Sequence, residues 1–312
     1  MRLRTLVARY VAHKRTLGMK FETPARDLKA FCRAMGNINM SGVRVDRVMR
    51  FLLPKDIRTP FYDRKYSVLT GFYEFAAGRG YVTRFPLPPR TPRQPQILVP
   101  YIYSRKEISV LLTLARRPYP RQSRVEPHVI HALLLLLYAA GLRISEALAL
   151  TLADVDVLND QLIVRDTKFY KSRCIPVCAD LKPALLEYLR RRARDYGDDP
   201  SGPCFPFKSG RPLTRACAEQ RFRRLCARAG IHRPGGPRVQ PRLHDLRHSA
   251  AVHRVLEWYR RGKDIQRLLP QLATFLGHVN LTSTQRYLTL TPELLNEASC
   301  RFEHHVQESC HE

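Results

Sequence analysis

The sequence of 312 residues has few acidic side chains. It carries 27 Asp and Glu against 54 Lys and Arg, which gives a formal net charge of +27 and an isoelectric point of about 10.4. A protein this basic is attracted to a polyanion, most simply a nucleic acid. Lysines are few, so arginine supplies most of the charge, and guanidinium groups match phosphate oxygens and guanine edges. The alternative is a solvated basic face that reflects only an arginine-rich genome.

Other absences narrow the class of protein. The eight cysteines include no Cys-x-x-Cys pair, so the sequence does not indicate a zinc cage. The first residues carry charges and no apolar signal core, so we expect reduced thiols and a cytoplasmic, nucleoid-associated protein. The longest uncharged stretch, residues 127–142, is short for a membrane span and predicts a buried core helix. No motif for a cofactor or a metal is present, and we expect neither.

A proline-rich stretch divides the chain. Residues 85–100 contain six prolines, which deny this segment a helix and predict an extended linker. We therefore predict a first domain over residues 1–84, a linker over 85–100 and a second domain from residue 101. Residues 1–95 hold 20 Lys and Arg against 6 Asp and Glu. A small module this basic is typical of a DNA clamp.

The first domain is predicted to be helical. Apolar residues recur at helical spacing in four segments, namely residues 2–17, 24–35, 43–53 and 62–79. The last segment carries an aromatic stripe that we interpret as core packing. Its members are Tyr66, Leu69, Phe72, Tyr73 and Phe75.

The second domain is predicted to be mostly helical with one small antiparallel sheet. A capping-box pattern, Ser104-Arg-Lys-Glu107, starts a helix through residue 116, and a second helix ends at Gly141. Residues 162–164 and 174–177 are short β-prone runs around a basic turn. Further helices are predicted near residues 180–194, 214–229, 245–261, 270–276 and 281–289, with Pro270 at a helix start. The fold class is thus a mostly α chain with an α+β catalytic domain.

Two pairs of residues in this domain suit phosphate chemistry. Arg143 and Glu146 are three residues apart, as are His244 and Arg247, so each pair can share one helical face. A guanidinium that faces a phosphate needs a carboxylate behind it, and Glu146 can fill that role. The alternative for the first pair is a surface ion pair worth under about 1 kcal/mol. His248 competes with His244 for the histidine role.

A lysine lies on the turn between the two β-prone runs. Lys168 on such a hairpin could donate a proton to a leaving 5′ oxygen, which is general acid catalysis. Lys171 and Arg173 are close by and could instead contact backbone phosphates. The residues alone do not choose between the two lysines.

A histidine and a tyrosine complete the set. His278 follows the helix-ending Gly277, and its ring could donate a hydrogen bond to a nonbridging phosphate oxygen. Tyr287 could attack the phosphorus. A phenol with a pKa of about 10 is a poor nucleophile at neutral pH, but nearby cations favour its ionised form and stabilise a pentavalent transition state. The alternative is an ordinary core tyrosine.

In this order, the motifs resemble the catalytic set of the tyrosine recombinase (phage integrase) family. The resemblance covers about residues 101–290, and residues 1–84 more loosely. It implies a site-specific DNA recombinase that cleaves and rejoins strands through a 3′-phosphotyrosine, without metal or nucleotide, in integration, excision or transposition. It assigns the catalytic lysine to Lys168 and the histidine role to His244. The catalytic residues it implies are Arg143, Lys168, His244, Arg247, His278 and the nucleophile Tyr287, with Glu146 behind Arg143.

Some details of the resemblance concern partners and subtype. The segment 264–275 is longer than usual, and Arg286 directly precedes Tyr287; both resemble transposon- or plasmid-borne recombinases. The resemblance implies double-stranded DNA, a tetramer on paired sites and possible sister recombinases as partners. The acidic tail, residues 291–312, would dock on a neighbouring protomer; the alternatives are that it packs on its own chain or is disordered. Alternative functions are a type IB topoisomerase-like nicking-closing enzyme and a non-catalytic DNA-binding protein.

Overall fold

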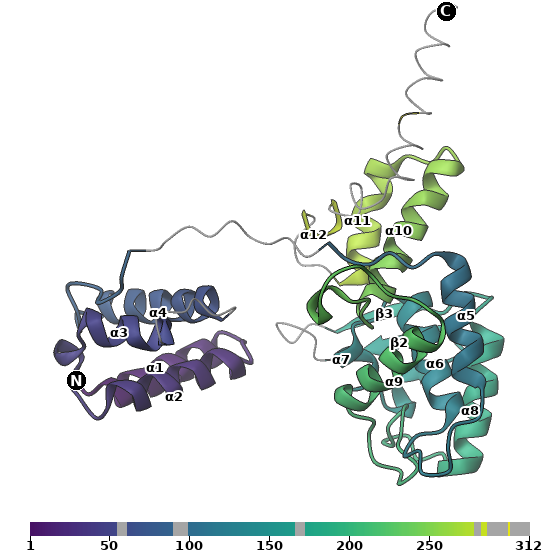
Figure 1. Ribbon diagram of the computed structural model, residues 1–312, viewed down its shortest axis with the longest axis horizontal. Helices are drawn as coiled ribbons and strands as arrows, with labels where there is room; N and C mark the ends of the chain where they lie inside the picture. Colours follow the sequence, from purple (N-terminus) through teal and green to yellow (C-terminus); the bar gives the residue numbers. More distant parts are fainter. Residues whose placement is uncertain (55–60, 90–98, 166–171, 278–281, 286–298, 300–312) are drawn as a thin grey trace, which may run out of the picture. The chain divides into compact units, whose positions relative to one another are not determined.

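The computed structural model describes residues 1–54, 61–89, 99–165, 172–277, 282–285 and 299. The described residues form two compact units, one before and one after the proline-rich stretch in the sequence (Figure 1). The predicted linker falls partly on residues 90–98, outside the described residues, and the domain limits stay a prediction.

The N-terminal unit is helical, as the periodicity predicts. Its elements are α1 (Leu3–Thr16), α2 (Glu22–Met35), the 3-10 helix η1 (Met40–Gly42), α3 (Val45–Leu52) and α4 (Tyr62–Ala77). Apolar side chains at helical spacing on each helix, such as Leu3, Leu6 and Tyr10 on α1, are buried in one common core. The aromatic stripe of α4 is part of it, because Leu69, Phe72 and Tyr73 are buried and the other two members pack against them.

The C-terminal unit is built around one apolar helix, as expected from the uncharged stretch. This helix, α6 (Pro127–Ala139), packs against α5 (Arg105–Arg116), α8 (Lys182–Tyr196) and α10 (Asp245–Arg260). The other elements are α7 (Ile144–Ala147), η3 (Leu152–Asp154), α9 (Arg215–Arg228), η4 (Pro237–Val239), α11 (Ile265–Leu276) and α12 (Thr282–Gln285). Among the described residues, no helix is long and apolar enough to span a membrane.

A three-stranded antiparallel sheet covers part of this unit. Its order is β1 (Val155–Asp156), β2 (Gln161–Val164) and β3 (Arg173–Pro176), with Val164 paired to Arg173. The first strand is an addition to the two predicted runs. Leu162 and Ile175 are fully buried, which fixes the register because a slip of one residue would turn them outward. The turn between β2 and β3 lies outside the described residues.

Two local predictions can be compared with the structure in detail. The capping box is confirmed: Ser104 Oγ accepts from the Glu107 N–H at 3.2 Å, and Glu107 Oε2 accepts from the Ser104 N–H at 2.7 Å. The predicted helix start at Pro270 is wrong. α11 begins after Asp264, whose side chain accepts from the Arg267 N–H at 3.2 Å, and Pro270 lies inside the helix. The helix starts earlier because the Asp264 side chain accepts a hydrogen bond from the Arg267 N–H, which has no partner within the helix.

Candidate active site

Three arginines of the C-terminal unit converge on one buried carboxylate. Glu146 lies in the short helix α7, and its side chain is 7% exposed. Oε1 accepts from Arg143 Nη1 at 2.7 Å and from Arg173 Nη1 at 3.0 Å, while Oε2 accepts from the Arg143 backbone N–H and from Arg173 Nη2, both at 2.9 Å. Arg247 Nη1 lies 4.0 Å from Oε2. We call Glu146 with these three residues the arginine cluster.

The arginine cluster keeps its carboxylate ionised. Burial alone would raise the pKa of Glu146, but hydrogen bonds from Arg173 and Arg143 outweigh burial and lower the pKa to about 2. The Arg143–Glu146 contact is therefore not the surface ion pair that the sequence left as an alternative. Arg143 is the residue before the first turn of α7 rather than a member of a longer helix, and 34% of its side chain is exposed.

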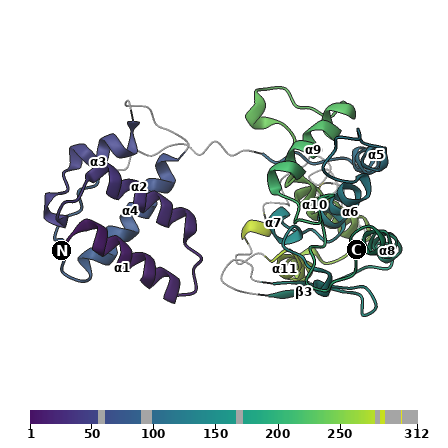
Figure 2. The same cartoon turned by 90° about the horizontal axis from the view of Figure 1, so that it is seen from below.

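The same three guanidiniums bind the end of α11. The carbonyl oxygens of three successive residues there each accept from a different arginine: Phe275 from Arg173 Nε at 3.3 Å, Leu276 from Arg247 Nη2, and Gly277 from Arg143 Nη2 at 2.9 Å. The last carbonyls of a helix have no partner within it and carry partial negative charge, so cations stabilise them. Figure 2 shows α7, β3 and α11 lying together in this part of the C-terminal unit.

A glycine lets two of these segments approach. Gly141, between α6 and α7, has φ +59°, and a Cβ there would stand 2.8 Å from Leu276 Cδ2. Its carbonyl oxygen accepts from Arg247 Nη1 at 2.5 Å. Arg247 is 2% exposed, so it ties the Gly141 turn to the end of α11 from inside the unit.

Both candidate histidines lie at the start of α10. His244 directly precedes the helix and His248 lies in its first turn, with their rings 4.8 Å apart and nearly perpendicular. Burial lowers the pKa of His244, and the positive charges of Arg247 and Arg143 lower it further. The neutral imidazole is therefore favoured at neutral pH. His244 precedes Arg247 of the arginine cluster by three residues at the start of α10.

The structure places part of the predicted set. Arg143, Glu146, His244 and Arg247 come together, while Lys168, His278 and Tyr287 lie outside the described residues, as does the tail over 291–312 apart from Ser299. The suggestion that Arg173 contacts DNA phosphates disagrees with the structure. Its side chain is only 14% exposed and binds Glu146 and Phe275. The signal for this was the strand alternation, because Arg173 shares a strand face with the buried Ile175.

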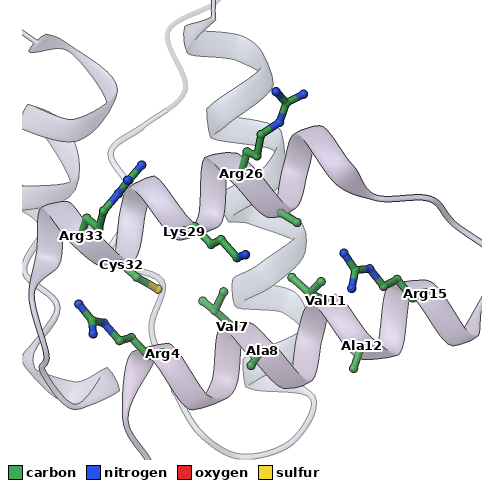
Figure 3. Close-up of a pocket in the computed structure, with 11 residues that line it drawn as sticks. Arg4, Val7, Ala8, Val11, Ala12, Arg15, Arg26, Lys29, Cys32 and Arg33 are labelled. Atoms are coloured by element: carbon green, nitrogen blue, oxygen red, sulfur yellow. The ribbon is translucent and has the colours of Figure 1, made fainter. Parts of the chain in front are cut away.

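A second basic surface belongs to the N-terminal unit. A groove of about 790 Å³ runs between α1 and α2. Figure 3 shows its apolar floor, which includes Val7 and Val11, and cationic side chains along its sides. These cations are Arg4, Arg15, Arg26, Lys29 and Arg33. Among the residues that the structure describes, no group of three or more His, Cys, Asp or Glu could hold a metal ion.

Comparisons with known proteins show the family of the chain. Residues 105–293 match the phage integrase family. A Sinorhizobium fredii protein described as an integrase/recombinase, y4rB, is 32% identical over 304 residues, which cover 96% of each chain. The tyrosine recombinase XerC of Bacillus subtilis is 29% identical over 239 residues, 74% of this chain and 71% of that one. A lambda integrase tetramer bound to a Holliday junction shares the fold, with a TM-score of 0.64 and 16% identity over 92% of this chain and 77% of that chain.

The chain belongs to the phage integrase family. It is therefore a site-specific DNA recombinase of the tyrosine type, an enzyme that cleaves and rejoins DNA strands. The sequence predictions of family, fold class and activity are confirmed. The topoisomerase-like and non-catalytic alternatives are not favoured.

Proposed function

We propose that the arginine cluster is the phosphate-binding part of the strand-exchange site. In this proposal Arg143 and Arg247 hold the scissile phosphate, and Glu146 orients Arg143 from behind. The remaining roles fall to the other members of the motif set. These are Lys168 as general acid, His244 as proton acceptor or hydrogen-bond donor, His278 as phosphate ligand and Tyr287 as nucleophile.

The convergence of separate motifs supports this proposal most directly. Arg143 and Arg247 come from motifs far apart in the chain. Arg143 nevertheless donates to Glu146, and Arg247 Nη1 lies 4.0 Å from the same carboxylate. Arg143 also binds the carbonyl oxygen of Gly277, the residue directly before His278. Three motifs thus meet at the end of α11, which a chance set of basic residues would not do.

The proposed chemistry needs positive charge that is fixed in advance. The ionised phenol oxygen of Tyr287 forms a bond to phosphorus while the bond from phosphorus to the 5′ oxygen breaks. Lys168 gives that oxygen a proton, which leaves a 3′-phosphotyrosine and a free 5′ hydroxyl. Charge grows on the nonbridging oxygens in the transition state, and preorganised guanidinium donors stabilise it. The phosphoester bond is exchanged rather than hydrolysed, so rejoining needs no nucleotide.

His244 suits the proton transfer in this scheme. Its lowered pKa keeps the ring neutral at neutral pH, so a ring nitrogen can accept the phenolic proton of Tyr287. His248 lies beside it and is the control for this assignment. Loss of His248 should slow cleavage less than loss of His244.

The partners follow from the same proposal. Cations along the groove between α1 and α2 would contact phosphates of double-stranded DNA. The lambda integrase of the same fold is a tetramer on a Holliday junction, which supports a tetramer on paired sites here. We place the enzyme in the cytoplasm, on the nucleoid, where it would integrate, excise or transpose a mobile element. Sister recombinases are further candidate partners.

A covalent-adduct assay tests the nucleophile. The full chain and Tyr287→Phe would be incubated, in the presence of a chelator, with duplexes that tile the DNA flanking the gene, each nicked so that the released end diffuses away. The expected result is a detergent-resistant protein–DNA band with the wild-type chain alone, while both proteins shift the DNA in a native gel. An adduct that persists in Tyr287→Phe would show that another residue attacks. Shifted DNA without adduct on every duplex would contradict strand cleavage.

A further inference from the structure

We propose that Arg173 is a positioning residue of the strand-exchange site. It fixes the carboxylate of Glu146 and the end of α11 in one arrangement, and through them it aims Arg143 at the phosphate. It does so without contacting DNA. This inference rests on the proposed function of the arginine cluster and adds a residue that the family motifs did not assign.

Arg173 and Glu146 form a bidentate ion pair. Two parallel hydrogen bonds, at 3.0 and 2.9 Å, join the two Nη atoms to the two carboxylate oxygens. A bidentate pair sets the plane of the carboxylate as well as its distance. The exposed fractions of the side chains are 14% for Arg173 and 7% for Glu146, so solvent competes little. Arg143 donates only one side-chain hydrogen bond to this carboxylate, besides its backbone N–H, so the bidentate contact with Arg173 supplies the second guanidinium that holds both oxygens.

That carboxylate is what directs Arg143. Oε1 of Glu146 accepts from Arg143 Nη1 at 2.7 Å and from Arg173 Nη1 at 3.0 Å. Rotation of the carboxylate would therefore move the guanidinium of Arg143 with it. A misplacement of about 1 Å in a reacting group is enough to slow a chemical step about 100-fold.

Arg173 also supports the backbone that precedes His278. Its Nε donates to the Phe275 carbonyl at 3.3 Å, and its guanidinium lies close to Gly277. A Cβ on Gly277 would stand 2.8 Å from Arg173 Nη1 and 2.9 Å from Cζ. Arg143 binds the carbonyl of this same glycine. Arg173 thus reaches Arg143 by two routes, through Glu146 and through the turn at Gly277.

The position of Arg173 in the sheet adds a third link. It is the first residue of β3 and pairs with Val164 at the end of β2. These two residues flank the segment that carries Lys168 along the chain. One side chain therefore joins the described ends of β2 and β3 to the arginine cluster.

The test compares Arg173→Met and Arg173→Lys with the wild-type chain and with Arg165→Met. Arg165 follows β2 on the same hairpin, but its side chain is 58% exposed and forms an ion pair with Asp154. The adduct rate is measured on a nicked duplex at saturating DNA. We expect the adduct rate to fall about 100-fold for Arg173→Met. It should fall about 10-fold for Arg173→Lys, which keeps the positive charge but loses the bidentate contact. Arg165→Met should stay within about threefold of wild type, because Asp154 keeps its hydrogen bonds from the backbone N–H and the hydroxyl of Thr151 and lies outside the arginine cluster.

Two further readouts separate positioning from a loss of folding or of DNA contact. DNA affinity and its salt dependence should be unchanged in Arg173→Met, because Nε and both Nη atoms of Arg173 already donate to Phe275 and Glu146. The rate of Arg173→Met should begin to fall at a higher pH than that of wild type as the solution is made more acidic. The reason is that the pKa of Glu146 rises when the bidentate contact with Arg173 is removed. A general folding defect would lower the rate without shifting the pH at which it begins to fall, and Arg173→Lys provides the second variant if the methionine variant does not fold.

The outcomes distinguish the two proposals. If the wild-type chain gives no Tyr287-dependent adduct, the proposed function fails. If wild type and Arg165→Met form adduct, and both Arg173 variants match them, only the positioning role fails. An Arg173→Met variant with weaker binding and a reduced salt slope would show that Arg173 contacts phosphate, which also overturns the inference.

Discussion

The arginine cluster predicts that Glu146 stabilises the fold in a pH-dependent way. Replacing it with glutamine removes the one negative charge among three guanidiniums while keeping the shape of the side chain. The folded-state pKa of about 2 stands against an ordinary value of 4.5. Each unit of difference corresponds to about 1.36 kcal/mol, so the ionised carboxylate contributes on the order of 3 kcal/mol. This agrees with the roughly 3–5 kcal/mol lost when one partner of a buried ion pair is removed.

The sign follows from the direction of the shift. A carboxylate with a lowered folded-state pKa contributes stability that is fully present above its unfolded pKa and disappears as the pH falls through the folded value. The wild-type chain should therefore lose about 3 kcal/mol between about pH 4.5 and pH 2 because of Glu146. Glu146→Gln lacks this component, so its deficit against wild type should be largest at neutral pH and shrink as the pH falls through that window.

The measurement is a urea titration followed by tryptophan fluorescence. The chain has one tryptophan, Trp258, and it lies partly buried in α10, so its signal reports on the C-terminal unit. The matched control is Glu219→Gln, since Glu219 forms an exposed ion pair with Arg215 at 2.6 Å. The control should change stability by less than about 1 kcal/mol. A Glu146→Gln chain within about 1 kcal/mol of wild type at pH 7, or an equal deficit at pH 7 and pH 2.5, would refute the argument.

Two further predictions concern the turn at Gly277 and the groove between α1 and α2. Gly277→Ala should slow adduct formation at least about 10-fold, because its Cβ would meet Arg173. Gly230→Ala is the control, with the same φ of +67° and nothing within 4 Å of its Cβ; equal rates in the two variants would contradict the packing argument. Arg26→Ala and Lys29→Ala should each lower the salt slope of DNA binding by about 0.9 if they neutralise one phosphate. Their adduct rate at saturating DNA should be normal, and an unchanged slope in both would exclude phosphate contacts by these two side chains.

The sequence predicted the elements of the site better than their contacts. Helix boundaries follow local signals such as the capping box at Ser104 and the apolar run that becomes α6. The pairing of Arg143 with Glu146 is equally local, since the two lie three residues apart. The bonds from Arg143 to Gly277 and from Arg173 to Phe275 join residues 134 and 102 positions apart. No periodicity carries that information, because it depends on how α11 packs.

Arg173 shows how a local pattern can still be misread. A basic residue beside two lysines on a basic hairpin favours phosphate contact on composition alone. Strand alternation places it instead on the face of Ile175, and an inward-facing arginine needs a buried acceptor. Glu146 is that acceptor. Its pairing with Arg143 leaves room for Arg173, since one carboxylate offers about four acceptor sites.

The balance of charge in the arginine cluster explains why one carboxylate serves three arginines. Without Glu146, three guanidiniums beside the end of one helix would repel one another, and the partial negative charge of the carbonyls could not offset this. With a carboxylate for each arginine, the site would be neutral and would attract no phosphate. One carboxylate leaves the cluster positive while fixing two of its members by direct hydrogen bonds. In the proposed site, a bound phosphate would compensate the remaining charge, most fully in the transition state, where the phosphate carries the most charge.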